Sequence, residues 1–383
     1  MYVSREDIGR RCGAARREME RAGVGALVAF GSPQLMARGV LRWLVDWPTP
    51  VFEEYLVLPL DGPVTLFVHD ASEAEFAREF CAADEVRVIP ALEYVSDPCR
   101  RAADFVRELG PGAVGTAGRG MSAGFLASLT RNLGRAAVNL DPQLERLRMV
   151  KSPEEMRLSE AAVRLNEDVF RHYAGLVRPG GREVDAVAEA SRFALSLGAE
   201  ELYWMSASGP VPRLALMAQA RGEGHVWRAG DCHSIILEHA AAGGHMGETT
   251  HLLSLGRPKE EYARAFAAVG EAQTAAASRI RPGATVGELA DAAEEALIAL
   301  GYAERRGPDV PPAPIGHGQG LDVWEVPCIV SGDMTPMVPG MRFNLHPSVR
   351  LKDGAVITSC DCWALEEGGA RRLSTLPREI LEV

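Results

Sequence analysis

The sequence lacks both a long hydrophobic run and an N-terminal leader pattern. No stretch approaches the ~18 uninterrupted apolar residues that a membrane-spanning helix needs. The first residues, Met1 to Asp7, show no basic segment followed by an apolar one, as a secretory signal would. These two absences predict a cytoplasmic protein with no membrane partner.

The sequence also lacks an excess of positive charge and an even set of cysteines. The formal net charge is −11, so the clustered Lys and Arg that phosphate backbones require are not expected, and no nucleic-acid partner is predicted. The seven cysteines are odd in number and scattered, which argues against a disulfide framework. The hydrophobic content of 47% and the charged content of 24% are ordinary for a globular protein. A length of 383 residues predicts two or three domains.

The N-terminal third alternates helical and apolar segments. Residues 5–23 carry apolar side chains at helical spacing, and further helical stretches lie near 71–81, 97–109 and 122–134. Short apolar runs that suit strands occur at residues 26–30, 55–59, 65–68 and 86–89. This alternation predicts an α/β domain over residues 1–143.

A second domain is predicted over residues 144–383. Ser152 is a suitable N-cap, with Pro153 in the first turn and two glutamates after it, so a long helix is expected over 153–177. An order of two helices followed by strands occurs at about 153–255 and again at about 258–363. This repetition indicates an internal structural duplication.

Six short motifs follow one another along this second domain. They are Leu144–Met156 at the domain junction, Gly230-Asp231, Gly244-His245, Pro282-Gly283, Gly316–Gly320 (Gly-His-Gly-Gln-Gly) and Pro339-Gly340 before Phe343–Pro347. In this order they resemble the creatinase/aminopeptidase P/methionine aminopeptidase superfamily. The resemblance implies an N-terminal α/β domain and a C-terminal α+β "pita-bread" domain with pseudo-twofold symmetry. It also implies a homodimer.

Metallopeptidases of this superfamily hold two divalent ions with Asp, Asp, His, Glu and Glu. Matched by motif, these positions fall in this chain on Leu237, Glu248, His317, His346 and Cys360. Leu237 cannot bind a metal. Glu238 would face the site only after a one-residue slip of its strand, whereas His239 shares the face of Leu237. The sequence therefore predicts a divergent member with altered metal ligands.

Four of the five positions still carry side chains that bind metals. Glu248, His317 and His346 are predicted to hold one divalent ion, with Cys360 as a fourth ligand or redox group. Two histidines and a carboxylate suit iron, zinc or manganese. Glu248, His317 and His346 are also the predicted catalytic residues. The predicted reaction is hydrolysis of a C–N bond in a small amino-acid-derived or guanidino-like substrate.

Three other interpretations stay open. If the ion is iron, oxygen chemistry would replace hydrolysis. A metal-free hydrolase or lyase in the manner of creatinase would use His317 as acid and base, although the creatinase histidine and glutamate positions fall on Gln219 and Thr250. A non-catalytic ligand-binding relative would need none of this chemistry. An ordinary dinuclear Xaa-Pro peptidase is not expected, because the family's second histidine falls on Trp324.

Four side chains are predicted to contact the substrate. Arg42 matches a family segment that often faces the active site, and its guanidinium could clamp a carboxylate. Trp204 precedes a pocket loop of the family, and Trp324 offers a flat apolar wall. His239 is the fourth. Cys360 and Cys362 should share one face of a strand, because side chains alternate along it.

Overall fold

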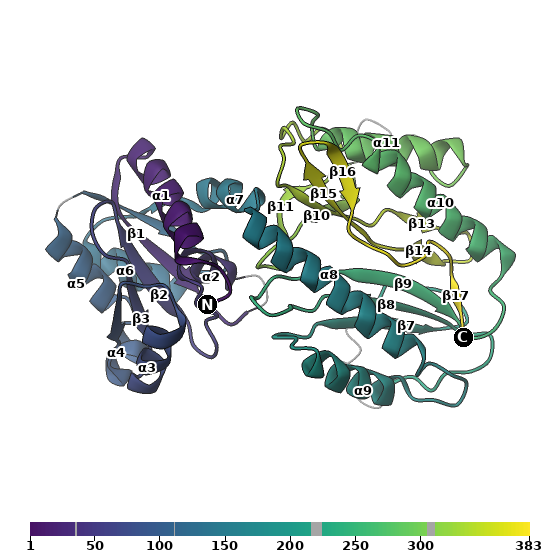
Figure 1. Cartoon of the computed structure of the whole chain (residues 1–383), viewed down its shortest axis with the longest axis horizontal. Helices are drawn as coiled ribbons and strands as arrows, with labels where there is room; N and C mark the ends of the chain where they lie inside the picture. The colour runs from purple at the N-terminus through teal and green to yellow at the C-terminus, as the bar shows by residue number, and fades with distance from the viewer. Residues whose placement is uncertain (35–36, 111, 216–223, 305–310) are drawn as a thin grey trace. The chain divides into compact units, whose positions relative to one another are not determined.

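The computed structural model describes residues 1–34, 37–110, 112–215, 224–304 and 311–383 (Figure 1). The chain divides into two compact units. The first comprises Met1–Arg148 with Leu321–Val323, and the second Met149–Gly320 with Trp324–Val383. The domain boundary predicted after residue 143 falls inside helix α7 (Asp141–Met149), whose residues up to Arg148 group with the first unit.

The first unit alternates strands and helices, as the sequence predicts. Its elements are α1 (Arg5–Arg21), β1 (Val24–Gly31), α2 (Gly39–Val45), β2 (Glu54–Pro59), β3 (Thr65–Val68), α3 (Ala71–Phe80), β4 (Glu85–Val88), α4 (Ala91–Ser96), α5 (Arg100–Leu109), β5 (Ala113–Ala117), α6 (Ala123–Leu133) and β6 (Val138–Asn139). Among the described residues, the strands form one six-stranded sheet in the order β4-β3-β2-β1-β5-β6. Strand β1 runs antiparallel to β2 and parallel to β5.

A short segment that is distant in sequence belongs to this first unit. Arg148 donates to Asp322 at 2.7 Å, and the backbone N–H of Gly39 donates to the other carboxylate oxygen at 3.1 Å. A Cβ atom on Gly39 would lie 2.4 Å from Asp322 and 2.1 Å from Arg148, so a larger residue there would displace this ion pair. These contacts hold Leu321–Val323, which directly follow the Gly-His-Gly-Gln-Gly motif, in the first unit.

The second unit contains two groups of helices and strands. Its elements are α8 (Pro153–Ala174), α9 (Glu183–Ser196), β7 (Trp204–Gly209), β8 (Cys232–Leu237), β9 (Thr249–Ser254), α10 (Glu260–Ala277), α11 (Gly287–Ala299), β10 (Gly316–Gly318), β11 (Glu325–Cys328), β12 (Arg342–Leu345), β13 (Ser348–Arg350), β14 (Val356–Thr358), β15 (Asp361–Glu366), β16 (Gly369–Arg372) and β17 (Leu381–Glu382). The described strands pair as β17-β9-β8-β7, β11-β10-β12-β15-β16 and β13-β14. Two helices precede each main group of strands, as the predicted duplication requires (Figure 1).

Helix α8 begins where the sequence predicts. The hydroxyl of Ser152 accepts from the backbone N–H of Glu155, and the Glu155 carboxylate accepts from the backbone N–H of Ser152 at 2.9 Å. This capping box satisfies two N–H groups that a helix start leaves unpaired. Pro153 occupies the first turn, where its missing N–H has no cost.

Each half of the second unit has its own hydrophobic core. Apolar side chains of α8 and α9 pack on one face of β7, β8 and β9, with Trp204 and Leu237 among them. Helices α10 and α11 pack on β12, β13 and β14. The halves are joined where the backbone N–H of Cys360 donates to the carbonyl of Thr250 at 3.1 Å. Within the described ranges, no helix is long and apolar enough to cross a membrane.

Candidate metal centre

Three of the predicted ligands come together in the second unit. Glu248 immediately precedes β9, His317 lies on β10 and His346 immediately follows β12. One ligand atom from each lies within 4.8 Å of the other two. A carboxylate and two imidazoles at this spacing are a donor set that suits iron, zinc or manganese.

The imidazole of His317 is fixed in one orientation. Its Nδ1 lies 2.8 Å from the carbonyl of Gly318, which can only accept, so Nδ1 carries the proton and Nε2 keeps its lone pair. Nε2 lies 3.6 Å from Oε2 of Glu248. The ring stacks on Trp324, with 4.5 Å between centroids and 15° between planes. Trp324 therefore acts as a flat wall against this histidine, and a metal ion would find Nε2 ready to bind.

Neighbouring polar side chains hold Glu248. Asn344 donates to Oε2 at 2.8 Å, and Thr250 donates to Oε1 at 3.1 Å. Burial alone would raise the pKa of Glu248, but His346, His317 and the hydrogen bonds from Cys360 and Thr250 hold it below its ordinary value. Burial also lowers the pKa of His317. An ionised carboxylate beside a neutral imidazole is the protonation state that metal ligation needs.

The loop that carries Glu248 is anchored to helix α8. The side chain of Asn166 donates to the carbonyl of His239 at 3.0 Å and accepts from its N–H at 2.9 Å. A Cβ atom on Gly247 would lie 2.3 Å from the carbonyl of Ala162, so the loop passes against the helix backbone. Glycine at 247 therefore allows the approach that fixes the next residue, Glu248.

Buried groups behind the site fix the chain around His346 and Cys360. The Gln273 amide of α10 donates to the carbonyls of Leu345 and Ser359, at 3.1 and 2.8 Å. Each carbonyl belongs to the residue just before a predicted ligand. One side-chain nitrogen thus ties together the two segments that carry His346 and Cys360.

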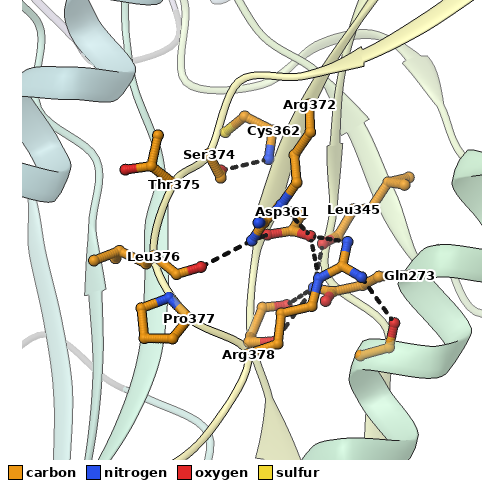
Figure 2. A network of polar contacts seen from close by, with 12 residues as sticks. Gln273, Leu345, Asp361, Cys362, Arg372, Ser374, Thr375, Leu376, Pro377 and Arg378 are labelled. Carbon is orange, nitrogen blue, oxygen red and sulfur yellow. Dashed lines mark hydrogen bonds and ion pairs between the residues drawn. The ribbon is translucent and has the colours of Figure 1, made fainter.

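Strand β15 is clamped from its other face. Figure 2 shows Arg372 and Arg378 directed at Asp361, and each donates to its carboxylate at 2.7 Å. Asp361 lies between Cys360 and Cys362, so its side chain points to the face opposite the two thiols. The backbone N–H of Cys362 donates to Ser374 at 2.9 Å (Figure 2). These contacts hold the two thiols in place from behind.

Cys360 and Cys362 lie next to Glu248 on the site face. Burial, together with hydrogen bonds to Cys362 and Glu248, raises the pKa of the Cys360 thiol well above its ordinary value. The pKa of Cys362 is lowered, first by the hydrogen bond from Cys360 and further by the Arg342 guanidinium, whose nearest nitrogen is 3.7 Å from the sulfur. The raised pKa favours the protonated Cys360 thiol, which can donate a hydrogen bond to Cys362 or Glu248. That Cys360 is a fourth metal ligand stays a prediction.

Glu238 faces the site, although the sequence predicted this only after a one-residue slip of its strand. The β8–β9 ladder pairs Leu237 with Thr249 and continues with a bridge between Ala240 and Met246, so Glu238 lies opposite Glu248 on the same face. Leu237 points instead into the core formed with α8 and α9. The Glu238 side chain is buried, and burial followed by the charges of Glu248 and Cys362 raises its pKa well above its ordinary value. The strand thus turns Glu238 towards the site without the slip that the sequence comparison required.

The other predicted substrate contacts are placed elsewhere. Trp204 and His239 lie on the helix-covered face with Leu237, where their rings meet edge to face at 4.6 Å. Nδ1 of His239 accepts from the N–H of Tyr203, and burial lowers the histidine's pKa to about 3. Arg42 belongs to the first unit, where it pairs with Asp46 at 2.9 Å. Gln219 lies outside the described residues.

Comparison with known proteins decides the family. Residues 157–374 match the metallopeptidase family M24. The chain belongs to metallopeptidase family M24. It is a hydrolase of the aminopeptidase P type, and members of this family use divalent metal ions. The resemblance stated from the motifs is confirmed.

Several relatives of this M24 chain are similar over most of their length. An uncharacterized peptidase YqhT of Bacillus subtilis is 25% identical over 84% of this chain and 90% of its own length. A probable dipeptidase PepE of Mycobacterium tuberculosis is 28% identical over 69% of this chain and 68% of its own length. The crystal structure of dipeptidase PepE from Mycobacterium ulcerans has 26% identity and a TM-score of 0.80, covering 100% of this chain and 99% of that one.

The fold of the M24 chain is confirmed by a further solved structure. The prolidase from Pyrococcus horikoshii aligns with a TM-score of 0.80 at 20% identity, over 97% of this chain and 100% of that chain. The predicted N-terminal α/β domain and C-terminal pita-bread domain are therefore both present.

Proposed function

We propose that this M24 chain hydrolyses a C–N bond in a small amino-acid-derived substrate, using one divalent ion held by Glu248, His317 and His346. The observation that carries the proposal is the convergence of these three side chains within 4.8 Å. A single ion is favoured because, among the described residues, Glu248, His317 and His346 are the side chains of this site whose ligand atoms converge, and Glu238 opposite Glu248 is a carboxyl group with a raised pKa. The relatives named dipeptidases make a dipeptide-sized substrate the first to test.

The donor set fits such an ion. Nε2 of His317 keeps its lone pair, and Glu248 is ionised with both of its oxygens oriented by Asn344 and Thr250. A bound divalent ion polarises a carbonyl oxygen and lowers the pKa of a bound water. The protein's own part is to hold these three ligands rigidly, through Trp324 stacked on His317 and Gln273 behind His346.

Glu238 supplies a proton in this proposal. Hydrolysis of an amide needs an acid that protonates the leaving nitrogen. The family's second histidine position is Trp324, whose indole is too weak an acid for this step. Glu238 lies on the face of Glu248 as a buried carboxyl group with a raised pKa, which is the state of a general acid at neutral pH. Its side chain therefore takes the place of the missing imidazole.

Metal content and activity test the proposal together. Protein purified without oxygen is analysed by elemental mass spectrometry, then stripped with a chelator and reloaded separately with manganese, zinc or ferrous ion. Each form is assayed with a panel of dipeptides and simple amides. The His317→Ala/His346→Ala double variant is compared with His172→Ala, which removes a histidine of α8 that stacks on Phe193 of α9.

The proposal predicts amide cleavage by a reloaded form, lost in the double variant and kept in His172→Ala. Activity that needs ferrous ion and consumes oxygen would instead support oxygen chemistry. Activity in the fully stripped protein would support the metal-free hydrolase. No turnover with any ion or substrate would contradict an enzymatic role for the cleft.

A further inference from the structure

A second group of metal-binding side chains lies in the first unit, apart from any family motif. His69 follows strand β3, Asp70 caps helix α3 and Glu73 lies in its first turn. One ligand atom from each lies within 4.8 Å of the other two. We call these three residues the His69 cluster; Glu54, at the start of β2, lies beside Glu73.

The burial of Glu54 beside this cluster separates it from an ordinary group of surface acids. Its side chain is fully buried, and Oε2 accepts from the indole N–H of Trp47. Its other oxygen, Oε1, has no hydrogen-bond partner among the described residues. The carboxyl group lies within hydrogen-bonding reach of the Glu73 carboxyl group. Two neighbouring carboxylates with no donor between them must share either a proton or a cation.

Helix capping explains only part of the arrangement. Oδ1 of Asp70 accepts from the N–H of Glu73 at 2.9 Å, and Oε2 of Glu73 accepts from the N–H of His69 at 3.1 Å. These bonds leave one oxygen on each carboxylate for another partner. They give no reason for Glu54 to be buried beside Glu73, and none for Nδ1 of His69, a buried nitrogen without a hydrogen-bond partner in the described structure.

The His69 ring is held in a fixed orientation. It stacks on Phe52, with 3.8 Å between centroids and 17° between planes, and the ring of Tyr94 meets it edge-on at 4.7 Å. Nδ1 lies 3.8 Å from Oδ2 of Asp70, on the side of the carboxylates. An imidazole packed in this way loses little freedom when it binds an ion.

The charge balance also favours a cation. Glu54, Asp70 and Glu73 provide three carboxyl groups, and the described residues place no arginine or lysine in an ion pair with any of them. Burying a carboxylate without a counter-charge is unfavourable, and a divalent ion would neutralise most of this charge.

We propose that the His69 cluster binds one divalent metal ion of the zinc type, through His69, Asp70 and Glu73, with the buried Glu54 lying beside Glu73. One nitrogen and two carboxylates are three ligands, and water would complete a four-coordinate site. The ion would join the end of β3 to the start of α3, so its role is structural. The site is independent of the chemistry at Glu248, because its three residues belong to the first unit.

Zinc titration of the full chain tests the proposal. Chelator-stripped protein is titrated with Zn²⁺ against a chromophoric chelator, and the melting temperature is followed with and without the ion. The variants are His69→Ala, Glu73→Gln and, as a matched control on the same helix, the exposed Glu75→Gln. Each is also made on the His317→Ala/His346→Ala background, which removes the cleft ligands.

On that background, one equivalent of Zn²⁺ is expected to bind and to raise the melting temperature. His69→Ala should abolish this equivalent, Glu73→Gln should weaken it at least tenfold, and Glu75→Gln should leave it unchanged. No saturable Zn²⁺ binding on that background would overturn the proposal. Binding that is the same in His69→Ala, Glu73→Gln and the control would overturn it too, whatever the cleft does. A metal-free melting temperature that matches the control shows that each variant is folded.

Discussion

Two buried histidine–carboxylate groups of the second unit differ in how completely their hydrogen bonds are used. On the helix-covered face, Ser208 donates to Glu183 at 2.8 Å and receives bonds from His233 at 2.7 Å and from Trp227 at 3.0 Å. Tyr173 lies 2.8 Å from the other ring nitrogen of His233. With Nδ1 protonated and Nε2 accepting from Tyr173, both ring nitrogens of His233 have a protein partner. We call Tyr173, Glu183, Ser208 and His233 the closed group.

The second group, Glu248, His317 and His346, is not closed by hydrogen bonds between its own side chains. Nε2 of His317 faces Glu248 at 3.6 Å, which is too long for a hydrogen bond, and His346 faces the same space. Both groups are buried, so burial alone does not distinguish them. A histidine with a protein partner on both ring nitrogens supports the fold, whereas histidine and carboxylate ligand atoms that converge without hydrogen-bonding one another are typical of a metal site.

The largest effect is expected from His317→Ala. Loss of one of three ligands should release the ion and lower kcat/KM by about 10³-fold or more. His233→Ala, which removes an equally buried histidine from the closed group, should change kcat/KM of the folded protein by less than about threefold. Steady-state kinetics on both variants with the best substrate makes the comparison. Equal losses in the two would remove the distinction between the groups.

Glu238→Gln is expected to lower kcat by about 10² to 10⁴-fold while the ion stays bound, because an amide cannot donate the proton that leaves with nitrogen. The pH–rate profile should lose its limb on the alkaline side, where the carboxyl group deprotonates. Substrates with a better leaving group should be affected least. A variant with unchanged kcat would return Glu238 to a structural role.

The closed group should matter for stability instead. His233→Ala leaves Tyr173 and Ser208 without a partner in the core, so the free energy of unfolding should fall by about 2–4 kcal/mol. Urea denaturation measures it. Arg164→Ala, at an exposed position of the same helix as Tyr173, is the control and should stay within about 0.5 kcal/mol of the parent. A His233→Ala protein as stable as this control would contradict the account of the closed group.

Acid should weaken the closed group before it unfolds the chain generally. Burial lowers the pKa of His233 to about 4 in the folded state, against an ordinary value of 6.5. The unfolded chain therefore binds a proton more readily, so the stability from neutral His233 is complete above about pH 6.5 and is lost as the pH falls towards 4. Between pH 7 and pH 5 this histidine should account for about 2 kcal/mol. The urea midpoint of His233→Ala should fall less than that of the parent over this range, and parallel slopes would exclude the effect.

Much of this organisation was predictable from local sequence. The Ser152 cap, the glycines of the β8–β9 turn and the Gly-His-Gly motif each specify their own backbone, so the helices, the hairpin and three converging ligands followed from their order. What could not be predicted is which face each strand residue takes. Counting residues placed Leu237 at a ligand position, but the sheet register turns it into the core and turns Glu238 towards Glu248. A slip of one residue reverses every face of a strand, and sequence spacing does not reveal it.

Long-range partners were equally hidden. Trp204 was predicted to contact substrate because of its motif neighbours and His239 because it shares the face of Leu237, yet the same register places both against the helices. The His69 cluster belongs to no motif of the family, although its three residues lie close together in sequence. Glu54 is 15 residues from His69 and comes beside Glu73 only through the pairing of β2 with β3. Such pairings depend on the assembled sheet.

The number of ions between Glu248, His317 and His346 tests the central claim most directly. Crystals grown with Mn²⁺ would be measured at a wavelength where manganese scatters anomalously. One anomalous peak within about 2.0–2.4 Å of Nε2 of His317 and of a Glu248 oxygen is predicted, with no second peak beside Glu238. Two peaks about 3.5–4 Å apart in the cleft, or none at full Mn²⁺ loading, would contradict the single-ion centre.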